Sequence, residues 1–310
     1  MLKHKPVLLS ETLELLNIKS YGIYVDCTLG RAGHSEKILE KLTTGKLYCL
    51  EQDKQAIIDA KVILNKFHNY EIIATNFRYL KKELQLRNIL QVDGIIYDLG
   101  VSSPQLDEAG RGFSYHQDGP LDMRMDQKQT LSAEVIVNNW SFKDIVNILW
   151  IYGEEKFART IARAILKYRE NSKIITTLQL VDIVKSALPM KILKKSKHHP
   201  ARKTFQALRI AVNDELNSLR VSLKQSLQLL KSEGVLVVIS FHSLEDRIVK
   251  TLFKEQVVPK FDPLLSKLPM PIKREPNFEL LTKKVVSPCE QEIQENSRAR
   301  SAKLRAIRKF

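Results

Sequence analysis

Residues 98–105, DLGVSSPQ, place an acid, a glycine, two serines and a proline directly after the apolar run VDGIIY. A short apolar run bounded by turn-forming residues is typical of a buried strand. The carboxylate of Asp98 at the end of such a strand can accept a hydrogen bond from an amine, and Ser102 and Ser103 add hydroxyl groups beside it. The alternative is that Asp98 only caps the turn that follows it.

A second acid, Asp26, ends the apolar run GIYVD and is followed by a turn that contains Gly30 and Gly33. A glycine turn between a strand and a helix brings backbone N–H groups close to a ligand. The Gly-x-x-Gly spacing differs from the GxGxxG of nicotinamide-binding proteins, which disfavours a dehydrogenase. An acid just before such a turn resembles the motif of S-adenosylmethionine (SAM) methyltransferases. A simple tight turn is the other interpretation.

Two more residues follow predicted strands. Asp53 ends the segment KLYCLEQD, and its two carboxylate oxygens suit the two hydroxyls of an adenosine ribose. The same residue is also a good N-cap for the helix expected after it. Phe77 follows the run EIIAT, where an aromatic ring can pack on an adenine face or simply belong to the core.

The elements that hold these residues alternate regularly along the chain. Apolar runs at 22–26, 46–53, 71–75 and 92–98 predict strands, and amphipathic segments at 35–42, 53–67 and 79–89 predict the helices between them. This order predicts an α/β fold with a doubly wound, mostly parallel sheet, to which 234–241 adds a further strand.

About 135 residues separate the fourth strand from that late strand, too many for one crossover, and much of this stretch has a helical pattern. We therefore expect an inserted helical domain at 109–204, between a first part of the main domain at 1–108 and a second part at 205–310. No internal repeat is visible.

The composition favours a polyanionic partner. The 310 residues carry a net charge of +15. Residues 186–204 hold six Lys or Arg and no acid, and so does the tail from residue 298. Each is either a nucleic-acid contact or a solvated basic surface. No apolar run is long enough to cross a membrane, and no signal peptide is evident. Because the three cysteines are widely spaced, we expect a reducing, cytoplasmic setting.

Several long motifs occur in order over nearly the whole chain: HKPVLLSETLELL, VDCTLGRAGHSEKIL, DGIIYDLGVSSPQLDEAGRGFSYHQDGPLDMRMD, HHPARKTFQALRIAVNDEL and VISFHSLEDRIVK. Together they closely resemble the RsmH (MraW) family of bacterial 16S ribosomal RNA cytosine-N4 methyltransferases. The resemblance implies a Rossmann-like class I methyltransferase fold with a helical insertion. From the size and the basic end of the insertion, we expect it to recognise the substrate. It further implies SAM as cofactor, no metal, and a decoding-centre cytosine of the small ribosomal subunit as target.

The resemblance also implies which residues act. The cofactor positions carry over to Ala32, Gly33, His34, Asp53, Phe77, Asp98 and Gln105, with Asp26 and Gly30 in the same turn. The family usually has glycine where this chain has Ala32, so a methyl group is expected to narrow the backbone approach there. Asp98, with Ser102 and Ser103, is the candidate for the chemical step.

Candidate substrate-binding residues fall into three segments: Arg111, Asp118, Asp122 and Arg124; His199 and Arg202; and Ser240 and His242. An Asp122–Arg124 pair that only fixes the loop is an equal alternative for the first segment. His198 and His199 lack the further ligands that zinc requires. In the third segment, SLED favours a helix start with Ser243 as N-cap and Asp246 as its third residue.

Two other functions compete. A DNA amino-methyltransferase would need a target-recognition domain, which is not recognisable here. A non-catalytic RNA-binding assembly factor would be expected to have a broken cofactor loop, yet Asp26, Gly30, Gly33, Asp53 and Asp98 are all present. The oligomeric state cannot be predicted from these patterns.

Overall fold

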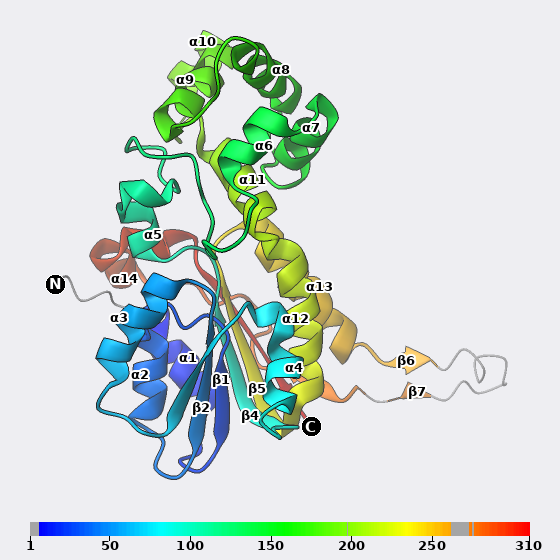
Figure 1. Cartoon of the computed structure of the whole chain (residues 1–310). Helices are drawn as coiled ribbons and strands as arrows, with labels where there is room; N and C mark the ends of the chain where they lie inside the picture. The colour runs from blue at the N-terminus through cyan, green and yellow to red at the C-terminus, as the bar shows by residue number, and fades with distance from the viewer. Residues whose placement is uncertain (1–5, 197, 262–272, 275) are drawn as a thin grey trace. The chain divides into compact units, whose positions relative to one another are not determined.

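A computed structural model of the chain describes residues 6–196, 198–261, 273–274 and 276–310, which form two compact units (Figure 1). The first unit combines residues 1–100 with 216–310, and the second is the continuous stretch 101–215. The expected insertion at 109–204 is therefore shorter than the second unit at both ends. The difference arises because α5 (Ser103–Asp107) contacts the turn η2 (Ala109–Arg111), and α11 (Arg202–Asn213) packs on α6 and α7.

The first unit is built on one seven-stranded sheet with the order β3-β2-β1-β4-β5-β9-β8. Its first five members in this order are parallel, whereas β9 runs antiparallel to β5 and β8 antiparallel to β9. This confirms the expected doubly wound, mostly parallel sheet. The strands are β1 (Ile23–Asp26), β2 (Lys46–Glu51), β3 (Tyr70–Ala74), β4 (Val92–Asp98), β5 (Leu230–Ser240), β8 (Phe278–Leu280) and β9 (Lys303–Lys309).

Helices cover both faces of this sheet. Figure 1 shows α1, α2 and α3 on one face and α4, α12 and α13 on the other. Their bounds are α1 (Leu9–Leu16), α2 (Gly33–Leu39), α3 (Lys54–Leu64), α4 (Leu80–Gln85), α12 (Glu215–Leu229) and α13 (Ser243–Val257). The shorter elements are η1 (Phe77–Tyr79), α14 (Glu290–Glu295), η3 (Ser297–Ser301) and the separate two-stranded sheet of β6 (Lys260–Phe261) and β7 (Lys273–Arg274).

The centre of the sheet is apolar on both faces, as a sheet covered by helices requires. All but the last residue of β4 are buried, and so are the last seven residues of β5. Because parallel strands end at the same edge of a sheet, the acids at the ends of β1, β2 and β4 all lie at that edge. Cys27 and Cys49 are buried, as expected of small core residues.

The basic C-terminal stretch is not a tail. Residues Lys303–Lys309 form β9, which pairs with β5 along its length, and Leu304, Ala306 and Ile307 are buried. The expectation of a basic tail was wrong because KLRAIRK alternates apolar and basic residues, which is the pattern of a half-buried strand. Its basic side chains pair with acids: Lys303 and Arg305 with Asp246, and Arg308 with Glu279 and Glu233.

The second unit has its own hydrophobic core, formed mainly by the helices α6 (Ala133–Asn139), α7 (Phe142–Ile151), α8 (Ala158–Arg169), α9 (Thr177–Ala187) and α11. The short helix α10 (Met190–Lys195) is exposed along most of its length. Each of α6, α7 and α9 begins at a serine or threonine whose hydroxyl accepts a backbone N–H, as N-caps do. No helix among the described residues has the length and apolar character to cross a bilayer.

Candidate active site

The turn after β1 is closed by Asp26. Its carboxylate accepts hydrogen bonds from the Thr28 backbone N–H at 3.0 Å and from the Ser35 hydroxyl at 2.7 Å. Burial raises the pKa of Asp26, against the opposing effect of these hydrogen bonds. Asp26 therefore fixes the path of the chain into α2 and also places a carboxyl group at the base of the turn.

The backbone of this turn needs left-handed conformations. Gly30 has φ +49°, and Ala32 has φ 59° and ψ 21° just before α2. A left-handed residue with a Cβ costs roughly 1–2 kcal/mol, so glycine would be the less strained residue at the position of Ala32. Here the Ala32 methyl is fully buried, and this burial offsets part of that cost. At Gly33 a Cβ would lie 2.5 Å from the Pro6 ring.

Glu51 links this turn to β2, and the sequence pattern alone did not predict it as a site residue. β2 ends at Glu51 rather than at Asp53. The Glu51 carboxylate accepts the backbone N–H of Gly30 at 2.9 Å, and those of Gln52 and Asp53 at 2.8 and 2.9 Å. Burial raises the pKa of Glu51, while these hydrogen bonds lower it. The sequence pattern predicts a strand at 46–53, which is two residues longer than β2. Glu51, the acid at the true end of the strand, was therefore not recognised as a strand-end acid.

Asp53 is 3% exposed and caps α3 by accepting the Gln55 backbone N–H at 3.0 Å. The N-cap interpretation of Asp53 is thus present in the structure. Its contact with a ribose stays a prediction, and Glu51 now stands beside it as a second candidate for that role.

Phe77 opens η1 and its residue is half-buried, so it is not a core phenylalanine. Its ring packs edge-on against Tyr97 of β4, with 5.7 Å between ring centres. The Phe77 carbonyl accepts the Ser222 hydroxyl at 2.8 Å, and Ser222 and Ser226 of α12 both contact the Tyr97 hydroxyl, at 2.5 and 2.8 Å. A buried polar network therefore fixes both the backbone and the ring of Phe77.

Asp98 is the last residue of β4 and directly follows Tyr97. Its backbone N–H donates to the Thr28 hydroxyl at 2.6 Å, which ties the end of β4 to the turn after β1. Its Oδ2 lies 3.6 Å from Nδ1 of His34, longer than a hydrogen bond, while His34 Nε2 is 3.0 Å from the Val7 carbonyl. Its Oδ1 is buried and, within the described residues, has no hydrogen-bond partner.

The environment of Asp98 changes its protonation. Burial, and then the neighbouring carboxylates of Asp26 and Glu245, raise its pKa to about 8. Although the side chain keeps 24% exposure, its unpartnered Oδ1 is inaccessible to water, so a strong effect of burial is reasonable. Asp26, Glu51 and Asp98 therefore share a raised pKa, and all three stand at the ends of neighbouring strands on this edge of the sheet.

From Val101 onward the chain belongs to the second unit. Ser102 is the N-cap of α5 and forms a capping box with Gln105: its N–H donates to Gln105 Oε1 at 3.0 Å, and its hydroxyl oxygen accepts the Gln105 N–H at 3.5 Å. Gln105 is 6% exposed. Ser103 is the first residue of α5, and its side chain lies outside the described part of the structure.

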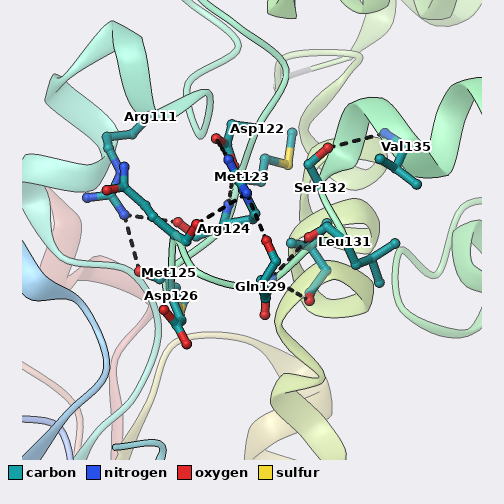
Figure 2. Close-up of polar contacts among 12 residues, drawn as sticks. Arg111, Asp122, Met123, Arg124, Met125, Asp126, Gln129, Leu131, Ser132 and Val135 are labelled. Atoms are coloured by element: carbon teal, nitrogen blue, oxygen red, sulfur yellow. Dashed lines mark hydrogen bonds and ion pairs between the residues drawn. The ribbon is translucent and has the colours of Figure 1, made fainter. Parts of the chain in front are cut away.

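Figure 2 shows the loop that contains Asp122 and Arg124. Their side chains form a two-pronged ion pair at 2.7 and 2.8 Å, and Arg124 also donates to the Gln129 carbonyl at 2.8 Å. Arg111, 8% exposed, donates to the Arg124 carbonyl at 2.9 Å. Asn213 holds the same loop from α11 by bonding the backbone of Met123 and Met125.

The Asp122–Arg124 pair fixes this loop, as the alternative to substrate binding in the sequence analysis expected. A direct role of Arg111, Asp122 and Arg124 in substrate binding stays a prediction. Asp118 likewise has a structural contact, because its carboxylate accepts the Leu178 N–H at 3.2 Å in the first turn of α9. Arg202 is the first residue of α11, and the His199 ring stacks on Tyr115.

The segment after β5 differs from expectation in its cap. α13 begins at Ser243 with His242 as N-cap, and the Glu245 carboxylate accepts the N–H groups of Phe241 and His242 at 2.8 and 3.2 Å. The expected Ser243–Asp246 cap was wrong by one residue, because Asp246 is engaged by Arg305 of β9 at 2.7 Å. The buried Ser240 hydroxyl donates to the Lys303 carbonyl at 3.3 Å.

Comparison with known proteins identifies the family of this chain. A model of the MraW methylase family matches residues 1–310. The chain belongs to the MraW methylase family. It is 52% identical, over the full length of both chains, to a protein of Mesoplasma florum named ribosomal RNA small subunit methyltransferase H. It is 53% identical to a protein of the same name from Spiroplasma kunkelii, over 98% of each chain.

The chain was also compared with solved structures. A ribosomal RNA methylase from Streptococcus thermophilus aligns with 100% of this chain and 99% of its own length, at 10% identity and a TM-score of 0.44. Membership of the MraW methylase family makes this protein a methyltransferase, and the strand-end acids of the first unit are its candidate active site.

Proposed function

We propose that this MraW methylase transfers a methyl group from SAM to the exocyclic N4 amine of a decoding-centre cytosine in 16S ribosomal RNA. Two full-length relatives named as small-subunit RNA methyltransferases support the substrate class. The observation that carries the chemical part is the carboxyl of Asp98, which has a buried, unpartnered oxygen beside the glycine turn. A cytoplasmic location and the small ribosomal subunit as partner belong to the same proposal.

The residues of the first unit fit SAM. The cofactor carries a positive sulfonium and a positive amino group, and the strand-end carboxyls Asp26, Glu51 and Asp98 all have raised pKa values that a cation would relieve. Glu51 or Asp53 would accept from the ribose hydroxyls, and the held ring of Phe77 would pack on the adenine. The remaining expected contacts in this unit are Gly30, Ala32, Gly33 and His34.

When bound, SAM supplies a methyl group already activated on a sulfonium, so no metal is needed for the transfer. The N4 amine of cytosine is a poor nucleophile because its lone pair is delocalised into the ring. A carboxylate oxygen of Asp98 that accepts a hydrogen bond from this amine favours its pyramidal, nucleophilic form. The same oxygen stabilises the positive charge that grows on nitrogen as the bond to carbon forms.

The protonation state of Asp98 is expected to change when the cofactor binds. In the empty site at neutral pH the carboxyl is mostly protonated, because its pKa is about 8. A cation in the site returns it to the carboxylate, which can then accept from the amine. This carboxylate can also accept the proton that the amine loses after transfer.

The proposed function is tested by identifying the methylated nucleoside. Small ribosomal subunits from cells that lack this enzyme, free 16S RNA and duplex DNA are each incubated with the protein and labelled SAM, and the digested nucleosides are separated. The proposal expects N4-methylcytidine in ribosomal RNA. Label in DNA would favour the amino-methyltransferase of DNA, and no label in any substrate despite SAM binding would favour an assembly factor.

A further inference from the structure

A loop of the second unit is fixed to the start of α9 in a way that the methyl-transfer chemistry does not require. The Thr177 hydroxyl donates to the Gln117 carbonyl at 2.7 Å, and the Gly119 N–H donates back to that hydroxyl at 3.1 Å. The Asp118 carboxylate accepts the Leu178 N–H, and hydrogen bonds from the Thr176 side chain and then from this N–H hold the pKa of Asp118 below its usual range. The residues just before Gln117 are therefore presented by a rigid loop.

Those preceding residues form a cluster of rings with His199. The Tyr115 ring stacks on the His199 ring with 4.6 Å between centres and 16° between planes, and its edge meets the core residue Phe205 at 5.6 Å. The His116 ring lies 4.6 Å from Tyr115 and 5.3 Å from His199. We name Tyr115, His116 and His199 the aromatic ledge.

Core packing does not explain the outer part of the ledge. Phe205 is 3% exposed and anchors the cluster, Tyr115 and His199 are half-buried, and His116 is exposed. Burial, followed by the charges of His116 and Lys185, lowers the pKa of His199, so its ring is neutral at pH 7 and stacks without a charge. An exposed imidazole on a rigid support is an available flat surface.

The surroundings of the ledge are strongly basic. His199 lies within residues 186–204, which contain no acid. The helix α10 in this segment exposes Lys191, Lys194 and Lys195 to solvent. On α11, Lys203 is exposed and donates to the Glu154 carbonyl. The rings and these exposed lysines, which lie close together in the sequence, provide the two features by which proteins hold single-stranded nucleic acid, base stacking and phosphate contact.

We propose that the aromatic ledge stacks an unpaired base of the RNA substrate while the lysines of α10 contact the neighbouring phosphates. The proposal rests on the proposed function in taking RNA as the substrate, and it assigns a surface to that recognition. A single-stranded or looped region is the ligand, because base pairing and stacking in a duplex hide the base faces that the ledge would use.

The stacking part is tested by fluorescence anisotropy with a fluorescein-labelled single-stranded RNA and the full-length protein. His116→Ala is expected to weaken binding about fivefold or more, since loss of one base–aromatic stack has at least this effect. His116→Phe keeps a flat ring and is expected to restore affinity. His68→Ala is the matched control, because His68 is an exposed histidine of the first unit with no ring contact described.

The phosphate part is tested by salt titration. Lys191, Lys194 and Lys195 are together replaced by glutamate, and the slope of log affinity against log salt is expected to fall by about 0.7 for each lost phosphate contact. The control reverses Lys41 and Lys61, which are exposed on the first unit. A double-stranded RNA of the same length should lose little affinity on His116→Ala.

The outcomes separate this proposal from the proposed function. Wild-type affinity in both His116→Ala and the α10 variant, with RNA methylation intact, would overturn the ledge and leave the proposed function standing. Equal losses in the control variants would also overturn it, since the effect would then be general electrostatics. Failure of the wild type to bind or methylate RNA would overturn the proposed function itself. Binding of S-adenosylhomocysteine should be unchanged in every variant, which shows that the first unit is folded.

Discussion

At the scale of single residues, Asp98 is a carboxyl held in an environment that opposes its own charge. Its neighbours in the first unit include two acids and a histidine, and one of its oxygens is buried without a partner in the described chain. Such an arrangement costs stability, and proteins keep such groups where they bind or react with a ligand. A cation and an amine are the ligands that this environment would favour.

This environment predicts a pH dependence of cofactor binding. Below pH 8 the empty site holds Asp98 protonated, and binding a cation favours the carboxylate, so binding SAM must release a proton. Affinity should therefore rise as pH increases towards about 8 and then level off. Calorimetry at pH 7 in two buffers of different ionisation enthalpy should show up to about one proton more released by the wild type than by Asp98→Asn. Equal proton release in both proteins would contradict the assignment.

The strand-end acids were predictable because a carboxylate after an apolar run has a simple spatial meaning in a parallel sheet. Asp26 and Asp98 lie as their positions indicate, with Thr28 joining the two strand ends. Glu51 was not predicted, since the end of β2 could not be placed to within two residues by apolar pattern alone. Its contact with Gly30 depends on the pairing of β1 with β2, which is a property of the fold.

At the scale of elements, the hydrogen bonds that join α12 to Tyr97 and Phe77 lead to a prediction that includes its own control variant. Ser222 and Ser226 both bond the Tyr97 hydroxyl, but only Ser222 also donates to the Phe77 carbonyl. Ser222→Ala should therefore weaken binding of SAM and of methylthioadenosine by about three- to tenfold, in line with one lost hydrogen bond. Ser226→Ala should bind both normally, and kcat should be close to wild type in both variants. Equal losses in the two variants would show that the network only supports the core.

The strand β9 gives a second prediction at this scale. Burial would raise the pKa of Asp246, but Arg305 and Lys303 outweigh it and lower that pKa. Arg305→Ala leaves a mostly buried carboxylate with a weaker partner and should reduce the free energy of unfolding by about 1–3 kcal/mol. Arg308→Ala removes a more exposed pair and should cost under about 1 kcal/mol. Denaturant titration of both variants measures the difference.

A role of Arg305 in RNA binding would contradict this description of β9. The salt dependence of RNA affinity should be the same in Arg305→Ala as in the wild type, because this arginine is 15% exposed and already paired. Its charge was predicted to belong to a tail, since a run of basic residues at a chain end is usually solvated. The acids that pair with β9 come from β8, α13 and the start of β5, and only the tertiary structure brings them together.

At the scale of the whole molecule, the chain divides into a discontinuous unit and a continuous one. Residues 101–215 have their own buried core, centred on four helices and α11. The sequence indicated this insertion from the length of helical pattern between two strands. It placed the boundaries eight residues late at the start and eleven residues early at the end, because packing of α5 and α11 cannot be inferred from periodicity.

This division predicts that residues 101–215 fold when expressed alone. The fragment should show helical circular dichroism and one cooperative thermal transition, since its core lies within the stretch. It should also retain part of the affinity for single-stranded RNA, and His116→Ala should reduce that affinity. A fragment without a cooperative transition would show that the second unit depends on the first for its stability.

The most direct test of the proposed mechanism is single-turnover methyl transfer by Asp98→Asn. The substrate is small ribosomal subunits from cells without this enzyme, and SAM affinity is measured in parallel at a pH above 8, where Asp98 of the wild type is ionised. Asparagine keeps the size of the side chain and an oxygen acceptor but cannot take the proton from the amine. We expect the rate of N4-methylcytidine formation to fall about a hundredfold or more while SAM still binds. A rate close to wild type with SAM bound would contradict the placement of Asp98 at the reacting amine.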